Sequence, residues 1–166
     1  MSFNSSASDE DPYKLAKMAA LDLLSRREHT AVEIVRKLSR RATLKEVNFE
    51  QLCSELIKEG WLSHQRFAES FIRAKRAKGD GPIKITHALR QRGLKSSEYQ
   101  AILAEYDDWG ELAYTILSRK VEAWPTEPKL RAKYQRFLQQ RGFDFAAINF
   151  AINQLRQDTQ ESLNNH

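Results

Sequence analysis

The sequence predicts an all-α protein built from three tandem three-helix repeats, and three observations support this. Apolar side chains recur at three- and four-residue spacing along most of the chain, and no segment alternates convincingly with a period of two. Only six Gly and four Pro interrupt 166 residues, which favours long helices. A helix pattern with a shared ending also recurs about every 50 residues, the spacing expected of a helical repeat.

The chain begins with a polar tail, which is followed by the first helices. Residues 1–12 are rich in Ser and Asp, so we expect a disordered tail there. Helical spacing begins at Tyr13. Thr30 and Glu33 have the spacing of a capping box, in which each side chain bonds an amide at the helix end, and they predict the start of the second helix.

The remaining helices have similar start and stop signals. Asn48 is placed to cap the third helix. Gly60 should end it in a left-handed conformation, with Trp61 folding back onto the last turn. The other expected helices are bounded by Ser63 and Lys78, Gly81-Pro82 and Gly93-Leu94, Ser96 or Ser97 and Tyr106, Trp109 and Trp124, Pro128 and Gly142, and Asp144 and about Gln157.

Equivalent residues define the repeat. They are Ile34, Ile85 and Tyr134; Leu38, Leu89 and Leu138; and Arg41, Arg92 and Arg141, the last two Arg being followed by Gly. Coincidence among amphipathic helices is the alternative, but the shared Arg-Gly ending argues against it. The expected organisation is a tail (1–12), repeats 13–62, 63–107 and 108–157, and a flexible end (158–166). Stacked units of this size gain stability from their neighbours, which favours an elongated, curved array.

Composition and charge exclude several classes of protein. A chain of this length can bury about 70% of its unfolded surface without a disulfide or metal, and its single Cys excludes a disulfide framework. No apolar run approaches the ~18–20 residues of a membrane span, so we expect a soluble, cytoplasmic protein. The net charge is +5, but the segment from Arg66 to Lys95 alone carries +7.

This basic segment is the candidate binding surface for an anionic partner, either nucleic acid phosphate or an acidic protein. On a helical wheel Arg66, Arg73 and Arg76 share a stripe opposite Phe67, Phe71 and Ala74, and Lys75 lies within the apolar arc. A solvated helix face, with Lys75 extending from the edge of the core, is the simpler alternative. The candidate partner-binding residues are Arg66, Arg73, Lys75, Arg76, Lys78, Lys84, Arg90 and Lys95.

The sequence contains no group of residues that composes an active site. No Gly-rich phosphate loop or His-Glu-x-x-His motif is present, and His29, His64 and His87 stand apart. Cys53, among apolar residues, is expected to be a buried, inert thiol. Asp107 and Asp108 stand where a helix should begin and are expected to cap it. We therefore expect a protein that is not an enzyme and that binds no metal or cofactor.

Three ordered stretches resemble the RecX family, regulators of the RecA recombinase. They are Arg27–Leu38 (REHTAVEIVRKL), Gly60–Leu94 (GWLSHQRFAESFIRAKRAKG, Asp80, then GPIKITHALRQRGL), and Lys133–Phe143 (KYQRFLQQRGF). Two departures occur. Ser63-His64 stands where the family usually has acidic residues, and Ala42 replaces the Gly that follows the repeat Arg.

The resemblance implies a negative modulator that binds RecA–DNA filaments in their helical groove. Proteins of this family restrain RecA ATP hydrolysis, strand exchange and the co-protease activity of the SOS response, in DNA repair and recombination. The implied partners are the RecA filament and single- or double-stranded DNA, with no membrane, and the protein is expected to be a monomer. The alternatives are a sequence-nonspecific nucleic-acid-binding protein acting through its basic helices, and a structural adaptor with unrelated partners.

Overall fold

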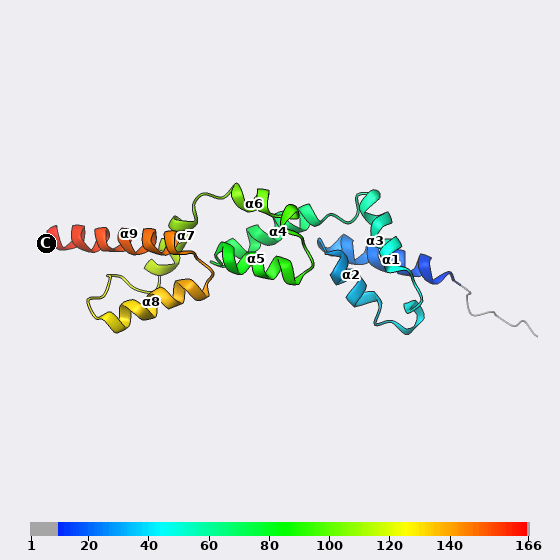
Figure 1. The fold of residues 1–166 in the computed structure, drawn as a ribbon, viewed down its shortest axis with the longest axis horizontal. Helices are drawn as coiled ribbons and strands as arrows, with labels where there is room; N and C mark the ends of the chain where they lie inside the picture. The colour runs from blue at the N-terminus through cyan, green and yellow to red at the C-terminus, as the bar shows by residue number, and fades with distance from the viewer. Residues whose placement is uncertain (1–9, 166) are drawn as a thin grey trace, which may run out of the picture. The chain divides into compact units, whose positions relative to one another are not determined.

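The computed structural model describes residues 10–165, so most of the tail predicted for residues 1–12 lies outside the described part. Within residues 10–165 the α-helices form three successive groups of three, which confirms the all-α repeat prediction (Figure 1). The helices are α1 (Pro12–Arg26), α2 (Ala31–Leu38), α3 (Phe49–Lys58), α4 (His64–Ala77), α5 (Pro82–Gln91), α6 (Gln100–Ala104), α7 (Trp109–Ser118), α8 (Pro128–Gln140) and α9 (Phe145–Asn164). Short 3-10 turns occupy Ala42–Leu44 and Ser96–Glu98.

The chain divides into two compact units, and the boundary between Phe67 and Ala68 lies inside α4. The N-terminal unit comprises α1, α2, α3 and the first residues of α4. The C-terminal unit contains the rest of α4 and all the helices that follow. The middle repeat therefore belongs mostly to the C-terminal unit.

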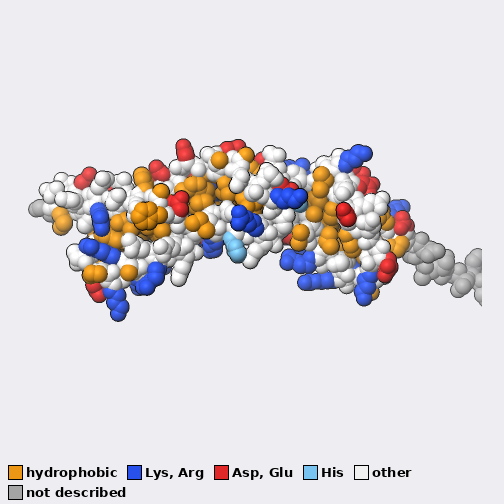
Figure 2. Space-filling model, viewed as in Figure 1, with side chains coloured by type: hydrophobic (Ala, Val, Ile, Leu, Met, Phe, Trp, Pro, Cys, Tyr) orange, Lys and Arg blue, Asp and Glu red, His pale blue; other side chains and the backbone are white. Residues whose placement is uncertain are grey.

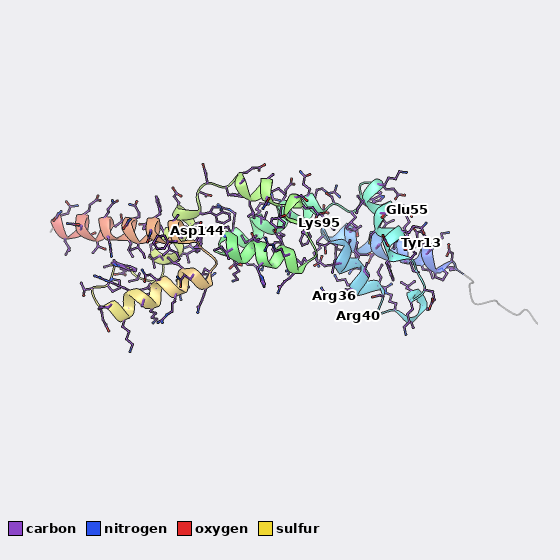
Figure 3. All side chains as sticks on the ribbon, viewed as in Figure 1. Tyr13, Arg36, Arg40, Glu55, Lys95 and Asp144 are labelled. Atoms are coloured by element: carbon purple, nitrogen blue, oxygen red, sulfur yellow. The ribbon has the colours of Figure 1, made fainter. Side chains whose placement is uncertain are left out.

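The N-terminal unit packs α1, α2 and α3 around one apolar core. Ala16 and Ala20 of α1 and Ile34 of α2 are fully buried in this core. A polar link joins α1 to α3, because the Tyr13 hydroxyl donates a hydrogen bond to Glu55 (Figure 3). The remaining core residues are Leu38, Leu44, Leu52, Cys53, Leu56 and Leu62.

In the C-terminal unit, the start of α5 is held against the end of α8. The Gly81 N–H donates to the Arg141 carbonyl at 2.7 Å, and the Ile83 N–H donates to the Gly142 carbonyl at 3.0 Å. These bonds satisfy two amides that a helix start leaves without a helical partner. A Cβ on Gly142 would lie 2.5 Å from the backbone nitrogen of Lys84, so the close approach requires glycine there. The middle and third repeats are therefore joined through their backbones.

Most of the predicted helix ends are confirmed. The capping box is present, with Glu33 N–H donating to Thr30 Oγ1 at 3.2 Å and Thr30 N–H donating to Glu33 Oε2 at 3.1 Å. Asn48 caps α3, and Ser63 and Asp144 accept amide hydrogen bonds at the starts of α4 and α9. These ends are set by side chains a few residues away, which is why sequence spacing alone can locate them.

The glycine endings are confirmed, but the predicted position of Trp61 is wrong. Gly60, Gly93 and Gly142 all have positive φ, and the side chains of Leu94 and Phe143, which follow two of them, are buried. The Trp61 amide closes the turn on the Leu56 carbonyl, yet Trp61 is 55% exposed. Leu62 fills the core in its place, because the chain turns inward one residue later.

Three helices differ in length from the prediction. The helix expected from Trp109 to Trp124 ends at Ser118. The segment expected as one helix from Ser96 to Tyr106 is a 3-10 turn followed by the five-residue α6, and the two are separated at Tyr99, whose φ is −137°. In the segment 158–166, expected as a flexible end, α9 continues as far as Asn164. Residues just past Gln157 explain this continuation, since Asp158 accepts a hydrogen bond from Tyr114, and Thr159 Oγ1 accepts one from the Trp124 N–H.

Candidate partner-binding surface

Three of the eight candidate cations are fully available to a partner. Arg73 and Lys78 are exposed on or just after α4. Lys95 is exposed and lies at the turn before α6, where Figure 3 labels it. The Arg73 guanidinium has no ion pair or hydrogen bond within the described residues. Lys78 uses only its backbone, whose carbonyl accepts a bond from Arg141 Nη1 at 2.9 Å. The charged ends of these side chains are thus free to meet an anion.

Lys84 and Arg90 of α5 are exposed but tethered by one contact each. Lys84 Nζ lies 2.8 Å from Oδ1 of Asp80, and half of the Lys84 side chain remains exposed. Asp80 itself is buried, and Arg141 Nη1 lies 3.9 Å from the same carboxylate oxygen. Arg90 Nε donates to the Tyr99 hydroxyl at 3.0 Å. These contacts fix where the two cations stand while leaving part of each in solvent.

Arg76 is held inside the C-terminal unit. Its Nη2 lies 2.7 and 2.8 Å from the two carboxylate oxygens of Asp108, and only 13% of its side chain is exposed. Its guanidinium carbon lies 4.1 Å from the ring centroid of Tyr106 and 4.3 Å from that of Trp109. Contact with two aromatic rings suits arginine more than lysine. Arg76 therefore supports the surface and does not present its charge on it.

Arg66 and Lys75 are also engaged. Arg66 Nε donates to Glu28 at 2.9 Å, and its Nη2 donates to the Gly60 carbonyl at 2.8 Å, so its contacts lie in the N-terminal unit. Lys75 is half-buried with its ammonium 5.4 Å from the Phe71 ring centroid. The sequence left two interpretations of Lys75 open: contact with a partner, or extension from the edge of the core into solvent. The observed geometry is that of extension from the edge of the core.

The helical wheel predicted the buried side of α4 better than it predicted which of its charged residues are exposed. Phe67, Ala68 and Ile72 are buried, but Ala74, expected on the same side, is exposed. Arg76 lies one turn beyond Ile72, where α7 and the segment before it cover that side of the helix. The wheel considers one helix alone and could not include these later residues.

The acids that position the basic residues were not predicted from the sequence. Asp108 stands at the N-cap of α7 as expected, but its side chain makes no cap hydrogen bond and pairs with Arg76 instead. Asp80 is buried between Lys84 and Arg141. The sequence did hold a signal that Asp80 pairs with a cation, because it is one of only two acidic residues among nine basic residues between Arg66 and Lys95.

The other residues considered for chemistry lie apart. Cys53 is buried as expected, and burial raises the pKa of its thiol. His87 is exposed, while His64 Nε2 accepts a hydrogen bond from the Ala31 amide at 3.1 Å. Among residues 10–165, no three His, Cys, Asp or Glu side chains are grouped so that they could hold a metal ion. None of the helices described is both long and apolar enough to cross a bilayer.

Comparison with known proteins finds the same family along most of the chain. Residues 63–103 match the family model described as RecX, second three-helix domain, and residues 107–152 match RecX, third three-helix domain. Regulatory protein RecX of Pseudomonas putida (strain GB-1) is 41% identical over 134 residues, covering 80% of this chain and 85% of the relative. Regulatory protein RecX of Pseudomonas fluorescens (strain Pf-5) is 38% identical over 141 residues, covering 84% and 90%.

Solved structures agree at the level of the fold. The crystal structure of RecX from Lactobacillus salivarius has a TM-score of 0.73 at 22% identity, covering 89% of this chain and 98% of that one. Another crystal structure of regulatory protein RecX has a TM-score of 0.71 at 24% identity, covering 86% and 74%. With helices in three groups of three and relatives about two-fifths identical over most of its length, the chain belongs to the RecX family of regulatory proteins.

Proposed function

We propose that this protein is a negative modulator of RecA that binds RecA–DNA filaments and inhibits ATP hydrolysis, strand exchange and SOS co-protease activity. The observation that carries the proposal is membership of the RecX family, whose curated relatives are named regulatory proteins. The proposed setting is the cytoplasm, where RecA and DNA are found, and the proposed active form is a monomer.

The contact surface we propose is the exposed part of the basic segment. Its members are Arg73, Lys78, Lys84, Arg90 and Lys95. Cations that remain in solvent speed the encounter with an anionic surface and favour specific docking more than they add affinity. Arg66, Lys75 and Arg76 would act indirectly, because their packing holds α4 in place beneath this surface. A protein that works by occupying a filament needs no catalytic group of its own.

The second candidate function is sequence-nonspecific binding of nucleic acid. It is favoured by the exposed Arg73 and Lys78, which have no acidic side chain paired with them in the described part of the chain. Pure phosphate binding weakens steeply with salt, with a log–log slope of about −0.9 for each phosphate neutralised on duplex DNA. This steep slope, and independence from RecA, would distinguish it from filament binding.

The experiment that tests the proposal is a titration of RecA ATPase activity on single-stranded DNA. Wild-type protein is added well below one copy per RecA subunit, and its binding to the same DNA without RecA is measured in parallel. We expect strong inhibition at ratios too low to coat the DNA. Inhibition only at coating ratios would favour the nucleic-acid-binding function, and absence of inhibition at every ratio would exclude the RecA proposal.

A further inference from the structure

Helix α8 in the third repeat carries a second concentration of positive charge, outside the basic segment described above. The segment from Arg119 to Arg141 has seven Lys or Arg and two acids, a net charge of +5 in 23 residues, and α8 itself contains no Asp or Glu. Figure 2 shows Lys and Arg side chains gathered over α8. The third repeat is therefore also a candidate for contact with an anion.

Three of these cations form one stripe on the solvent side of α8. Lys129, Lys133 and Arg136 follow at four- and three-residue spacing, which places them on one face of a helix. All three side chains are exposed, and none has an ion pair or hydrogen bond within the part of the chain that the structure describes. The opposite side holds Leu138, which is fully buried, so the stripe points away from the core.

Other cations nearby are used by the fold, which sets the stripe apart. Arg131 Nε donates to the Pro125 carbonyl at 2.7 Å, and Arg141 Nη1 donates to the Lys78 carbonyl at 2.9 Å. Lys120 Nζ lies 5.1 Å from the ring centroid of Phe137. Each of these cations makes a contact within the fold that accounts for its position.

The stripe residues weaken the helix that carries them. Lys129 lies in the first turn of α8, where the positive end of the helix dipole disfavours a cation, and no acidic residue occupies that turn. Glu127, at the N-cap, makes no side-chain cap hydrogen bond. Like charges at i and i+4, such as Lys129 and Lys133, destabilise a helix further. This arrangement costs the helix some stability, and a bound polyanion would offset that cost.

We propose that Lys129, Lys133 and Arg136 bind the sugar–phosphate backbone of DNA. At a rise of about 1.5 Å per residue the three positions step along the axis by roughly 6 and 4.5 Å, a regular row of cations for a regular row of phosphates. The other stripe members are Ala132 and Gln140, so the stripe lacks the large apolar anchor on which protein interfaces usually depend. Contacts of this kind position DNA without reading its sequence.

The repeat gives independent support for this choice. The offsets of the aligned helices make Arg136 equivalent to His87 in the middle repeat and Arg36 in the first, and all three are exposed. The first and third units carry an arginine at this position, and the middle unit carries an imidazole, so each unit presents a nitrogen-bearing side chain there. The inference goes beyond the RecA proposal and does not depend on it, because DNA alone suffices as the ligand.

The test uses full-length protein and fluorescein-labelled oligonucleotides, in single-stranded and duplex form, with anisotropy measured over a range of salt concentrations. The triple variant Lys129→Gln, Lys133→Gln, Arg136→Gln should bind on the order of tenfold or more weakly, with a salt slope reduced by about 2 to 3. Circular dichroism and thermal unfolding of the variant should show a fold at least as stable as wild type, because the changes remove repulsion.

The matched control is Lys14→Gln, Lys45→Gln, Lys58→Gln, which removes the same charge from exposed sites in the N-terminal unit. Unchanged DNA affinity in the stripe variant would overturn the proposal, and so would an equal loss in the control, which would show a net-charge effect. A loss confined to labelled polyglutamate would point to an acidic protein partner and would also overturn it. RecA inhibition is scored separately, so failure here is distinct from failure of the proposed function.

Discussion

Arg76 and Asp108 connect the last turn of α4 to the start of α7, with Arg76 Nη2 2.7 Å from the nearer carboxylate oxygen. The same guanidinium lies over the rings of Tyr106 and Trp109. An ion pair that is half in solvent contributes little by itself. Stacking on two aromatic rings makes the contact stronger, because it removes the cation from water onto surfaces that attract it.

Replacing Arg76 should therefore destabilise the C-terminal unit more than replacing its acidic partner. We expect Arg76→Ala to lower the free energy of unfolding by about 1–3 kcal/mol, since it removes a charged hydrogen bond and two stacking contacts. Asp108→Asn, which leaves the stacking intact, should cost less than about 1 kcal/mol. Urea unfolding followed by far-UV circular dichroism measures both, and equal losses would contradict a dominant role for the rings.

Gly142 lies where the end of α8 packs closely against the start of α5. Its replacement should lower the stability of the fold for two separable reasons. Its φ is +89°, which costs an L-residue roughly 1–2 kcal/mol. In addition, a Cβ would lie 2.4 Å from Lys84 Cβ and 2.5 Å from the Lys84 backbone nitrogen, which cannot move without displacing α5. We expect Gly142→Ala to lower the midpoint of thermal unfolding markedly.

Gly60→Ala is the matched control for Gly142→Ala. Gly60 has a similar φ of +80°, but no heavy atom lies within 4 Å of the position its Cβ would take. It should show only the backbone cost, so the difference between the two variants measures the close approach of α5 and α8. If both variants lose the same stability, the close approach is not a constraint on the fold.

These examples also show how far the sequence could predict the structure. Helix ends such as the Thr30–Glu33 capping box were predictable because both partners lie within one turn. The pairing of Arg76 with Asp108 was not, because it joins residues 32 positions apart and depends on how the helices pack. The sequence thus located the basic segment but could not distinguish its free cations, such as Arg73, from those used in packing.

The same limit applies to Trp61 and Leu62. Both are apolar and follow Gly60, so either could satisfy the hydrophobic contact of a glycine-ended helix. Their burial is decided by the path of the chain into α4, which local spacing does not specify. Leu62 is 1% exposed and Trp61 is 55% exposed.

The N-terminal unit should lose stability in mild acid because of His29. This side chain is buried, with Nδ1 3.0 Å from the Arg27 carbonyl oxygen and Nε2 3.0 Å from Lys37 Nζ. Burial lowers the pKa of His29 below its ordinary value of 6.5; the hydrogen bond to the Arg27 carbonyl and the charge of Glu33 oppose this, while the charges of Arg27 and Lys37 add to it. The unfolded chain therefore takes up a proton at a higher pH than the folded chain does.

It follows that the free energy of unfolding should fall as the pH drops below 6.5, the ordinary value for His29. Urea unfolding at about pH 7.5 and about pH 5.5 measures this change. His29→Gln should flatten the profile, since glutamine does not titrate and can still form hydrogen bonds. An identical pH dependence in wild type and His29→Gln would assign the effect to other groups.

The free cations of the basic segment should control inhibition of RecA without affecting the fold. We expect Arg73→Glu with Lys78→Glu to weaken inhibition of RecA ATPase on the order of tenfold, because reversal of exposed charge repels an anionic partner. The unfolding midpoint should be unchanged, since both side chains are in solvent. Inhibition is measured as the concentration of variant needed to halve the ATPase rate.

Two further variants separate charge at the surface from support beneath it. Lys14→Glu with Lys58→Glu changes the net charge equally from exposed sites in the N-terminal unit and should inhibit like wild type. Arg76→Lys keeps the charge but loses the planar stacking, so it should lower stability with little direct effect on binding by folded protein. If Arg73→Glu with Lys78→Glu inhibits as well as this surface control, the filament contact lies elsewhere on the molecule, because reversing two exposed charges of the segment would then have no effect on partner binding.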